Sequence, residues 1–235
     1  LPFYPQFLVE CTQVFLLKIQ TNWEMLRNEV FFIPFLLQFF VFFDKILLGE
    51  RSMLKQKDIL DEKSGKILRT ISKDVKFPMS EDDIFLINNM IQYLRLSQDE
   101  EYALKYDIRA GMGLAAVQLG VLKRFFVISY KNDDGTFEEY KVINPKVLSH
   151  SEELIYVEEG EGCLSVNRAV DGIVPRYARI TVEYYDEFGQ KHEKRIREEI
   201  AVAFQHEIDH LNGILFVDKI DKKDPYKNQD NMRAI

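Results

Sequence analysis

Apolar residues recur with a helical period in the segment that begins near Ser80. They occupy every third or fourth position, at Ile84, Ile87, Ile91 and Leu94. This spacing predicts an amphipathic helix of about 20 residues, which buries one stripe and exposes the rest. Ser80 with Asp83 three positions later predicts a capping box at the start of the helix.

A two-residue period follows and predicts antiparallel strands. The predicted strands are 124–130, 137–143, 147–157, 179–185 and 194–196. Asp134-Gly135 is a typical hairpin turn between the first two, and Gly189 is the predicted turn between the last two. Asn144-Pro145 is expected to end the second strand, because proline cannot donate a backbone hydrogen bond.

Residues 200–211 are apolar nearly all round, which predicts a buried helix. Asn212-Gly213 is expected to end it. Strands followed by one buried helix predict an α+β fold, with mostly antiparallel sheets packed around a central buried helix that carries the sequence HExxH.

Composition fits one globular core. The chain has 235 residues, of which 46% are hydrophobic, and its formal net charge of −7 does not suggest a nucleic-acid surface. We therefore expect no direct nucleic-acid binding. Its two cysteines, Cys11 and Cys163, lie too far apart in sequence to suggest a disulfide framework.

The HExxH segment is the strongest chemical signal. His206 and His210 are four residues apart, so on a helix both imidazoles face the same side and can hold one metal ion. Glu207 follows directly and can reach a water held by that metal. The same string can occur by chance on a charged surface helix. The apolar surroundings oppose that interpretation, because burying these groups unpaired would cost several kcal/mol.

The third ligand decides the chemistry. In peptidases with HExxH it lies downstream, but here Phe216 occupies the histidine position and no glutamate follows Glu207. Downstream aspartates remain candidates within a Lys- and Asp-rich tail, namely Asp218, Asp221, Asp224 and Asp230. Cys163 is the better candidate, although a lone cysteine is often only a small buried apolar residue. One thiolate and two imidazoles would leave a fourth position open, as catalytic metals require.

Residues 111–118 form a glycine- and alanine-rich segment. Its small residues allow a close backbone approach, but Ala116 breaks the spacing of a dinucleotide-binding fingerprint. The segment is either a tight packing turn or the lining of a substrate site, with the Gln118 amide as a hydrogen-bond donor.

Three blocks occur in order: GxGLAAxQ at 111–118, EGCLS at 161–165 and QHExDH at 205–210. Together they resemble the peptide deformylase family over residues 54–225. The segment 97–109 is similar to the insertion of its type 2, Gram-positive-like branch. The resemblance implies an enzyme that removes the formyl group from the N-terminal methionine of new polypeptides. Its expected substrates are N-formyl-methionyl nascent chains near the ribosome, in a bacterial-type cytoplasm.

The resemblance also implies residue roles. Cys163, His206 and His210 match the metal ligands, and Glu207 matches the general acid/base. This donor set suits Fe(II), Zn, Ni or Co, and the family leads us to expect Fe(II). In the expected reaction, metal-bound water attacks the formyl carbon, Glu207 takes its proton and passes it to the leaving amine, and formate departs.

The remaining matches concern the substrate. Gln118 and the backbone N–H of Leu164 match the donors to the oxyanion. Gly113 matches a backbone contact to the peptide, and Met112 with Val202 matches the lining of the methionine pocket.

Val117 departs from the family, which usually has proline there, so Gln118 could be held less firmly. Two alternatives therefore stay open. One is a catalytically impaired deformylase-like protein that binds peptides. The other is a zinc endopeptidase, which Phe216 and the missing downstream glutamate disfavour.

Residues 1–52 form a hydrophobic N-terminal extension, distinct from the expected catalytic domain at 53–235. The apolar run at 30–43 is shorter than the ~20 residues that a membrane-spanning helix needs. Three interpretations compete: a membrane or organelle-targeting leader, a helical packing extension, or translated sequence upstream of a true start at Met53. We favour the third. An organellar or membrane-associated location, with membrane contact through 30–48, is expected only if that segment is genuine.

Overall fold

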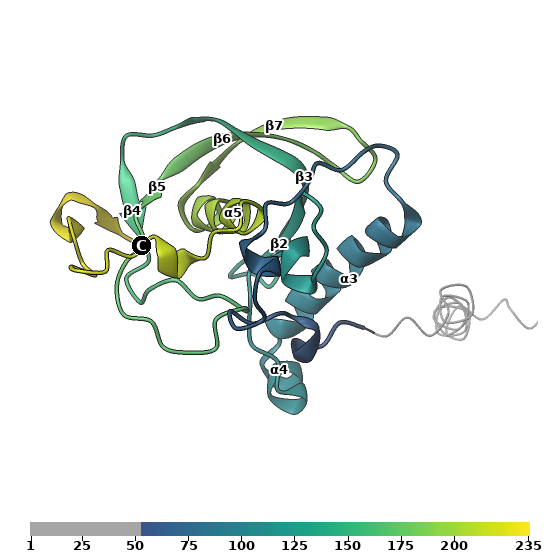
Figure 1. The fold of residues 1–235 in the computed structure, drawn as a ribbon, viewed down its shortest axis with the longest axis horizontal. Helices are drawn as coiled ribbons and strands as arrows, with labels where there is room; N and C mark the ends of the chain where they lie inside the picture. Colours follow the sequence, from purple (N-terminus) through teal and green to yellow (C-terminus); the bar gives the residue numbers. More distant parts are fainter. Residues whose placement is uncertain (1–52) are drawn as a thin grey trace, which may run out of the picture. The chain divides into compact units, whose positions relative to one another are not determined.

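The five-stranded antiparallel sheet forms the centre of the computed structural model, which describes residues 53–235 (Figure 1). Its strands, in spatial order, are β1 (Gly113–Ala115), β2 (Phe125–Lys131), β3 (Phe137–His150), β6 (Arg179–Tyr185) and β7 (Lys191–Arg197). A smaller sheet contains β5 (Arg176–Tyr177), β4 (Leu154–Tyr156) and β8 (Arg233–Ala234). Only the β4–β8 pair is parallel among these strands.

Three α-helices and several short 3₁₀ turns accompany the described strands. The α-helices are α3 (Glu81–Ser97), α4 (Glu100–Tyr106) and α5 (Glu198–Leu211). The 3₁₀ turns are Gln56–Asp58, Ile67–Arg69, Ala116–Leu119, Phe216–Asp218 and Gln229–Asn231. The predicted α+β class with mostly antiparallel sheets is confirmed.

Strand β2 is buried on both faces. Its side chains point alternately to the core that contains α3 and to the core that contains α5. Phe125 and Val127 pack in the cluster that contains the apolar stripe of α3. Phe126 and Ile128 pack in the cluster that contains Phe204 of α5. Helix α5 therefore lies on one side of the sheet, beneath the arch of β6 and β7 (Figure 1).

Helix α5 ends where the sequence predicts. Asn212 caps it, and Gly213 follows in the left-handed region at φ 74°. A Cβ at Gly213 would lie 2.5 Å from the Arg69 carbonyl oxygen, so both the backbone angle and the close packing require glycine. This end fixes the last turn of the helix that carries His206 and His210.

The start of α3 is only partly as predicted. The helix has 17 residues, and the Ser80 hydroxyl accepts a hydrogen bond from the Asp83 N–H at 3.2 Å. The second hydrogen bond of the predicted capping box, from the Ser80 backbone N–H to the Asp83 carboxylate, does not form, so that part of the prediction is wrong. The Asp83 carboxylate instead accepts from the Ser80 hydroxyl and the Lys123 ammonium, both at 2.6 Å.

Asn144-Pro145 does not end its strand, so that prediction is wrong. β3 continues to His150 through a shift in register between Ile143 and Lys146. Asn144 adopts φ 52°, and its side-chain amide bonds to both backbone groups of Val75, at 2.8 and 2.9 Å. The side chain thus supplies a partner strand's hydrogen bonds where the ladder is interrupted.

Two other strand boundaries differ from the predictions. The predicted strand 147–157 is divided between the end of β3 and the separate β4, and the predicted strand 194–196 is the second half of the longer β7. The predictions for 1–52, including the apolar run, lie outside the described residues. Within residues 53–235, no helix combines the length and apolar content needed to cross a membrane.

Candidate active site

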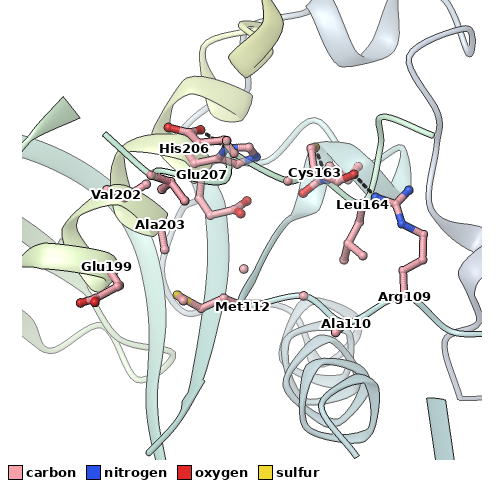
Figure 2. A pocket seen from close by; sticks show the side chains of 17 residues that line it. Arg109, Ala110, Met112, Cys163, Leu164, Glu199, Val202, Ala203, His206 and Glu207 are labelled. Carbon is pink, nitrogen blue, oxygen red and sulfur yellow. Dashed lines mark hydrogen bonds and ion pairs between the residues drawn. The ribbon is translucent and has the colours of Figure 1, made fainter. Parts of the chain in front are cut away.

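A cavity of about 330 Å³ opens between α5, the β1 segment and the loop that carries Cys163 (Figure 2). It gathers predicted site residues from three distant parts of the chain. Those that line it are Met112, Gly113, Gln118, Cys163, Leu164, Val202, His206 and Glu207. His210 is the one predicted site residue that does not line it, and it lies directly behind Cys163.

Cys163, His206 and His210 converge as potential metal ligands. One side-chain donor atom from each lies within 4.8 Å of the others, and all three residues are buried. The Cys163 Sγ is 3.2 Å from the His210 Nε2. The two histidines share a face because they lie one helical turn apart on α5, and the cysteine approaches from the loop between β4 and β5. No other such group occurs in the part of the chain that the structure describes.

A buried ion network orients the first histidine. The Nδ1 of His206 lies 2.9 Å from a Glu161 carboxylate oxygen, which leaves its other ring nitrogen free to face Cys163. Arg176 binds Glu161 through two hydrogen bonds at 2.6 and 2.9 Å, and binds Asp209 at 2.5 Å. Glu161, Arg176 and Asp209 thus form one buried network of ion pairs behind His206.

The network sets the charges around the site. Burial alone would raise the pKa of Glu161, but the hydrogen bonds and charge of Arg176 lower it to about 2. Burial alone would lower the pKa of His206, but hydrogen bonding to Cys163 and Glu161 raises it well above its usual 6.5. Burial and the neighbouring His206 hold the pKa of His210 well below the usual value. Glu161 is thus a permanent anion behind His206.

Glu207 has the environment of a proton carrier. Burial raises its pKa to about 7, and its Oε2 has no hydrogen-bond partner among the described residues. Gly113 lies directly against it, because a Cβ at position 113 would overlap the Glu207 Oε1. A buried carboxyl group with an unused oxygen at a cavity wall can accept and return a proton near neutral pH.

Gln118 is held firmly although Val117 precedes it. The Gln118 side chain is 1% exposed, and its Oε1 accepts the Ala115 N–H at 2.8 Å. Its Nε2 donates to the Ser165 hydroxyl at 3.0 Å and lies 3.8 Å from the Cys163 Sγ. The expectation that valine leaves this amide loosely held is therefore wrong.

Arg109 is a site residue that sequence reasoning missed. Its guanidinium donates to the carbonyl oxygen of Cys163 at 2.6 Å (Figure 2). It also donates to the Val166 carbonyl oxygen at 3.2 Å and to the Asn167 side chain. It therefore ties the 109–113 segment to the loop that carries Cys163. No sequence motif predicts that Arg109 holds this loop, because its main acceptors are backbone carbonyl groups, which every residue has.

None of the four downstream aspartates belongs to the group of potential ligands, and two of them form ion pairs elsewhere. Phe216 is buried and packs against His206, with ring centroids 5.9 Å apart. Asp218 pairs with Arg69, and Asp221 pairs with Lys227 at 2.8 Å. This arrangement does not favour the endopeptidase alternative.

The cavity brings three potential metal ligands together beside a buried carboxyl group, an arrangement typical of metal-dependent hydrolases. Comparison with known proteins gives its family. The family model described as polypeptide deformylase matches residues 57–226. The chain therefore belongs to the peptide deformylase family and is an enzyme of that family.

Similar proteins agree with this assignment. A peptide deformylase of Macrococcus caseolyticus is 47% identical over 184 residues, which cover 78% of this chain and 100% of the relative. The crystal structure of a peptide deformylase from Thermotoga maritima has a TM-score of 0.54 and 35% identity, covering 69% of this chain and 96% of that one. A Met-Ala-Ser-bound class I type b peptide deformylase from Acinetobacter baumannii has a TM-score of 0.55 and 28% identity, with the same coverage.

Proposed function

We propose that this chain removes the formyl group from the N-terminal methionine of newly made polypeptides, with the residue roles given below. The observation that carries this proposal is the meeting of Cys163, His206 and His210 beside Glu207 in one cavity. The Acinetobacter relative is bound to Met-Ala-Ser, and we infer that this cavity also accepts a peptide beginning with methionine.

The donor set fits a divalent metal ion. A thiol and two imidazoles within 4.8 Å can hold one cation, and the contact of the His206 Nδ1 with Glu161 is the usual support for a histidine ligand. We propose Fe(II) as the native ion, with Zn, Ni or Co as alternatives. When bound, such a cation acidifies water and polarises the formyl carbonyl.

Glu207 is the proposed general acid/base. It takes a proton from the attacking water and returns it to the amine nitrogen as the carbon–nitrogen bond breaks, so that formate and the free peptide leave. A pKa of about 7 suits both steps, because the group exchanges protons readily near neutral pH. The Gln118 amide and the Leu164 N–H are the proposed donors to the developing oxyanion, where one donor is typically worth about 2.7–4 kcal/mol.

The peptide is proposed to lie along β1, which is an edge strand of the five-stranded sheet. Gly113 would offer its backbone there, since the residue has no side chain to obstruct the approach. Met112 and Val202 line the same cavity and are the proposed contacts of the methionine side chain. Both side chains are apolar, as a thioether-containing substrate requires.

Loss of Glu207 tests the mechanism. Glu207→Ala in anaerobically purified protein should retain bound metal and lose nearly all formate release from formyl-Met-Ala-Ser. The matched control is Glu198→Ala, on the same helix, because Glu198 pairs with Arg233 at the surface. Normal turnover in the Glu207 variant would remove this residue from the proposed mechanism.

The same samples separate the alternative functions. Casein cleavage without formate release would indicate an endopeptidase. Binding of the peptide by metal-loaded protein with no chemical change would indicate a deformylase-like binding module.

We further propose a nascent-chain substrate near the ribosome, a cytoplasmic location and the type 2 branch. The helix α4 within the 97–109 segment supports the branch. Residues 53–235 are the proposed catalytic domain, since the family match and the compact unit beginning at Met53 both lie there. A chain starting at Met53 should release formate as fast as the full chain. A lower kcat in the shorter chain, at equal metal content, would show that residues 1–52 contribute.

A further inference from the structure

The face of the five-stranded sheet opposite α5 carries a second hollow, which deformylation does not use. Its volume is about 330 Å³, and strands β3, β6 and β7 with the turn after β3 enclose it. The residues that line it are Ser149, His150, Ser151, Arg179, Ile180, Thr181 and Arg195.

Strand geometry explains why polar groups gather there. Along β6, Ile180 and Val182 point into the core beneath the sheet, so Arg179 and Thr181 point to the opposite face. Thr181 lies directly opposite Arg195 of β7. The register of β3 shifts between Val147 and Ser149, and the hollow lies beside this irregularity.

The lining is rich in hydrogen-bond donors and contains no carboxylate. Arg179 is neutralised by Glu153 at 2.6 Å, but within residues 53–235 no hydrogen bond or ion pair engages the Arg195 guanidinium. The Ser149 and Thr181 hydroxyl groups have no hydrogen-bond partner among these residues either. The Ser151 hydroxyl, in contrast, accepts from the Arg179 N–H and donates to the Glu153 carbonyl oxygen. The hollow therefore presents one uncompensated positive charge between two free hydroxyl groups.

The neighbouring charges strengthen this field. Arg197 lies on the same face of β7, opposite Arg179, and within residues 53–235 no hydrogen bond or ion pair engages its guanidinium. An anion beside Arg195 would offset this additional positive charge. Guanidinium groups bind phosphate oxygens in pairs, and hydroxyl groups can donate to the remaining oxygens. We propose that this hollow binds a phosphate group.

The phosphate can have two sources, a small phosphorylated molecule or the backbone of RNA. The chain's net charge of −7 predicted no nucleic-acid contact, but a net charge does not describe a local site. The proposal is independent of deformylation, because the hollow and the cavity with Glu207 share no residue.

Amide chemical shifts of the full chain, titrated with inorganic phosphate at constant ionic strength, test the proposal. We expect saturable shifts confined to residues 149–151, 179–181 and 195. Arg195→Gln should weaken phosphate binding about tenfold, as expected for loss of a charge-assisted hydrogen bond. The matched control is Lys191→Gln, on the same strand and face but paired with Glu183, and it should bind phosphate normally.

A single-stranded uridine decamer then distinguishes the sources. Tighter binding of the decamer than of phosphate, lost in Arg195→Gln, supports the phosphate site with RNA as its source. Binding of phosphate alone supports the site with a small ligand. The proposal is overturned if chloride produces the same shifts, if no shifts occur, or if Arg195→Gln binds phosphate like the unaltered chain. Formate release should be unchanged in both variants.

Discussion

Adding one methyl group at Gly113 should disable the active site while leaving the fold intact. Gly113 lies in β1, where it pairs with Ile128 of β2, and its open side faces Glu207. A Cβ at this position would overlap the Glu207 Oε1 and lie 2.9 Å from both the Cδ and the Cγ. Because the strand is held by its ladder and the carboxylate ends a flexible side chain, Glu207 must give way.

The geometry sets the size of the effect. To restore ordinary van der Waals distances, the carboxylate must withdraw by about 1 Å, a displacement that can cost about 100-fold in rate when it moves a reacting group. A 100-fold loss corresponds to about 2.7 kcal/mol of transition-state stabilisation. The cost in folding free energy should be about 1 kcal/mol, at the low end for overpacking.

Two causes of lost activity can be distinguished by steady-state deformylation of formyl-Met-Ala-Ser, with metal content measured on the same sample. Displacement of Glu207 should lower kcat in Gly113→Ala at full metal content. A methyl group that only obstructs the peptide would raise KM instead. The control is Gly162→Ala in the same cavity, because a Cβ there meets nothing within 4 Å and its backbone is outside the left-handed region.

One result would refute this reasoning. If Gly113→Ala turns over substrate like Gly162→Ala at equal metal content, Glu207 does not act from the position described. If both variants lose activity equally, the cavity is intolerant of any added methyl group, and the specific contact with Glu207 explains nothing.

Two further predictions concern the loop and the fold. Arg109→Met removes donors to the Cys163 loop and should weaken metal retention about tenfold in chelator competition. The control Arg168→Met loses only an exposed ion pair and should retain metal normally. Equal retention in the two variants would contradict the role of Arg109. Burial alone would raise the pKa of Asp83, but its hydrogen bonds, chiefly with Lys123, lower it. Its stabilisation is therefore present above the unfolded-state pKa of about 3.9 and is lost as pH falls through the folded value. The Tm of Asp83→Asn should fall below that of the unaltered chain at pH 7 and converge with it at acidic pH, and a constant difference would contradict this.

Local pattern predicted the elements whose stability is local. The stripe from Ile84 to Leu94 gave α3, and strict alternation gave β6 with its correct bounds. The prediction failed at Asn144 because a side chain replaced the missing ladder bonds by reaching Val75, which lies 69 residues earlier. Such a contact depends on tertiary packing and leaves no local signal.

The candidate site shows the same division. The resemblance identified Cys163, His206 and His210 together, but no spacing in sequence determines that a sulfur and an imidazole nitrogen lie 3.2 Å apart. Arg109 was missed because its partners are carbonyl groups. The chemical type of each side chain follows from the sequence. A side chain that donates hydrogen bonds to distant backbone carbonyl groups can be recognised only in the folded structure.

Arg176 shows why the metal site and the folded core cannot be separated in this chain. Its side chain is among the largest that are fully buried, and an unpaired charge there would be expensive. Glu161 and Asp209 offset that cost, and Glu161 also contacts His206. Removing one partner of such a buried pair typically costs about 3–5 kcal/mol, a large part of a domain's stability. The block around Cys163 therefore contributes a metal ligand and, two residues earlier, the carboxylate that neutralises the core arginine. A substitution at that carboxylate would disturb the orientation of His206 and the folding free energy together, because one side chain serves both.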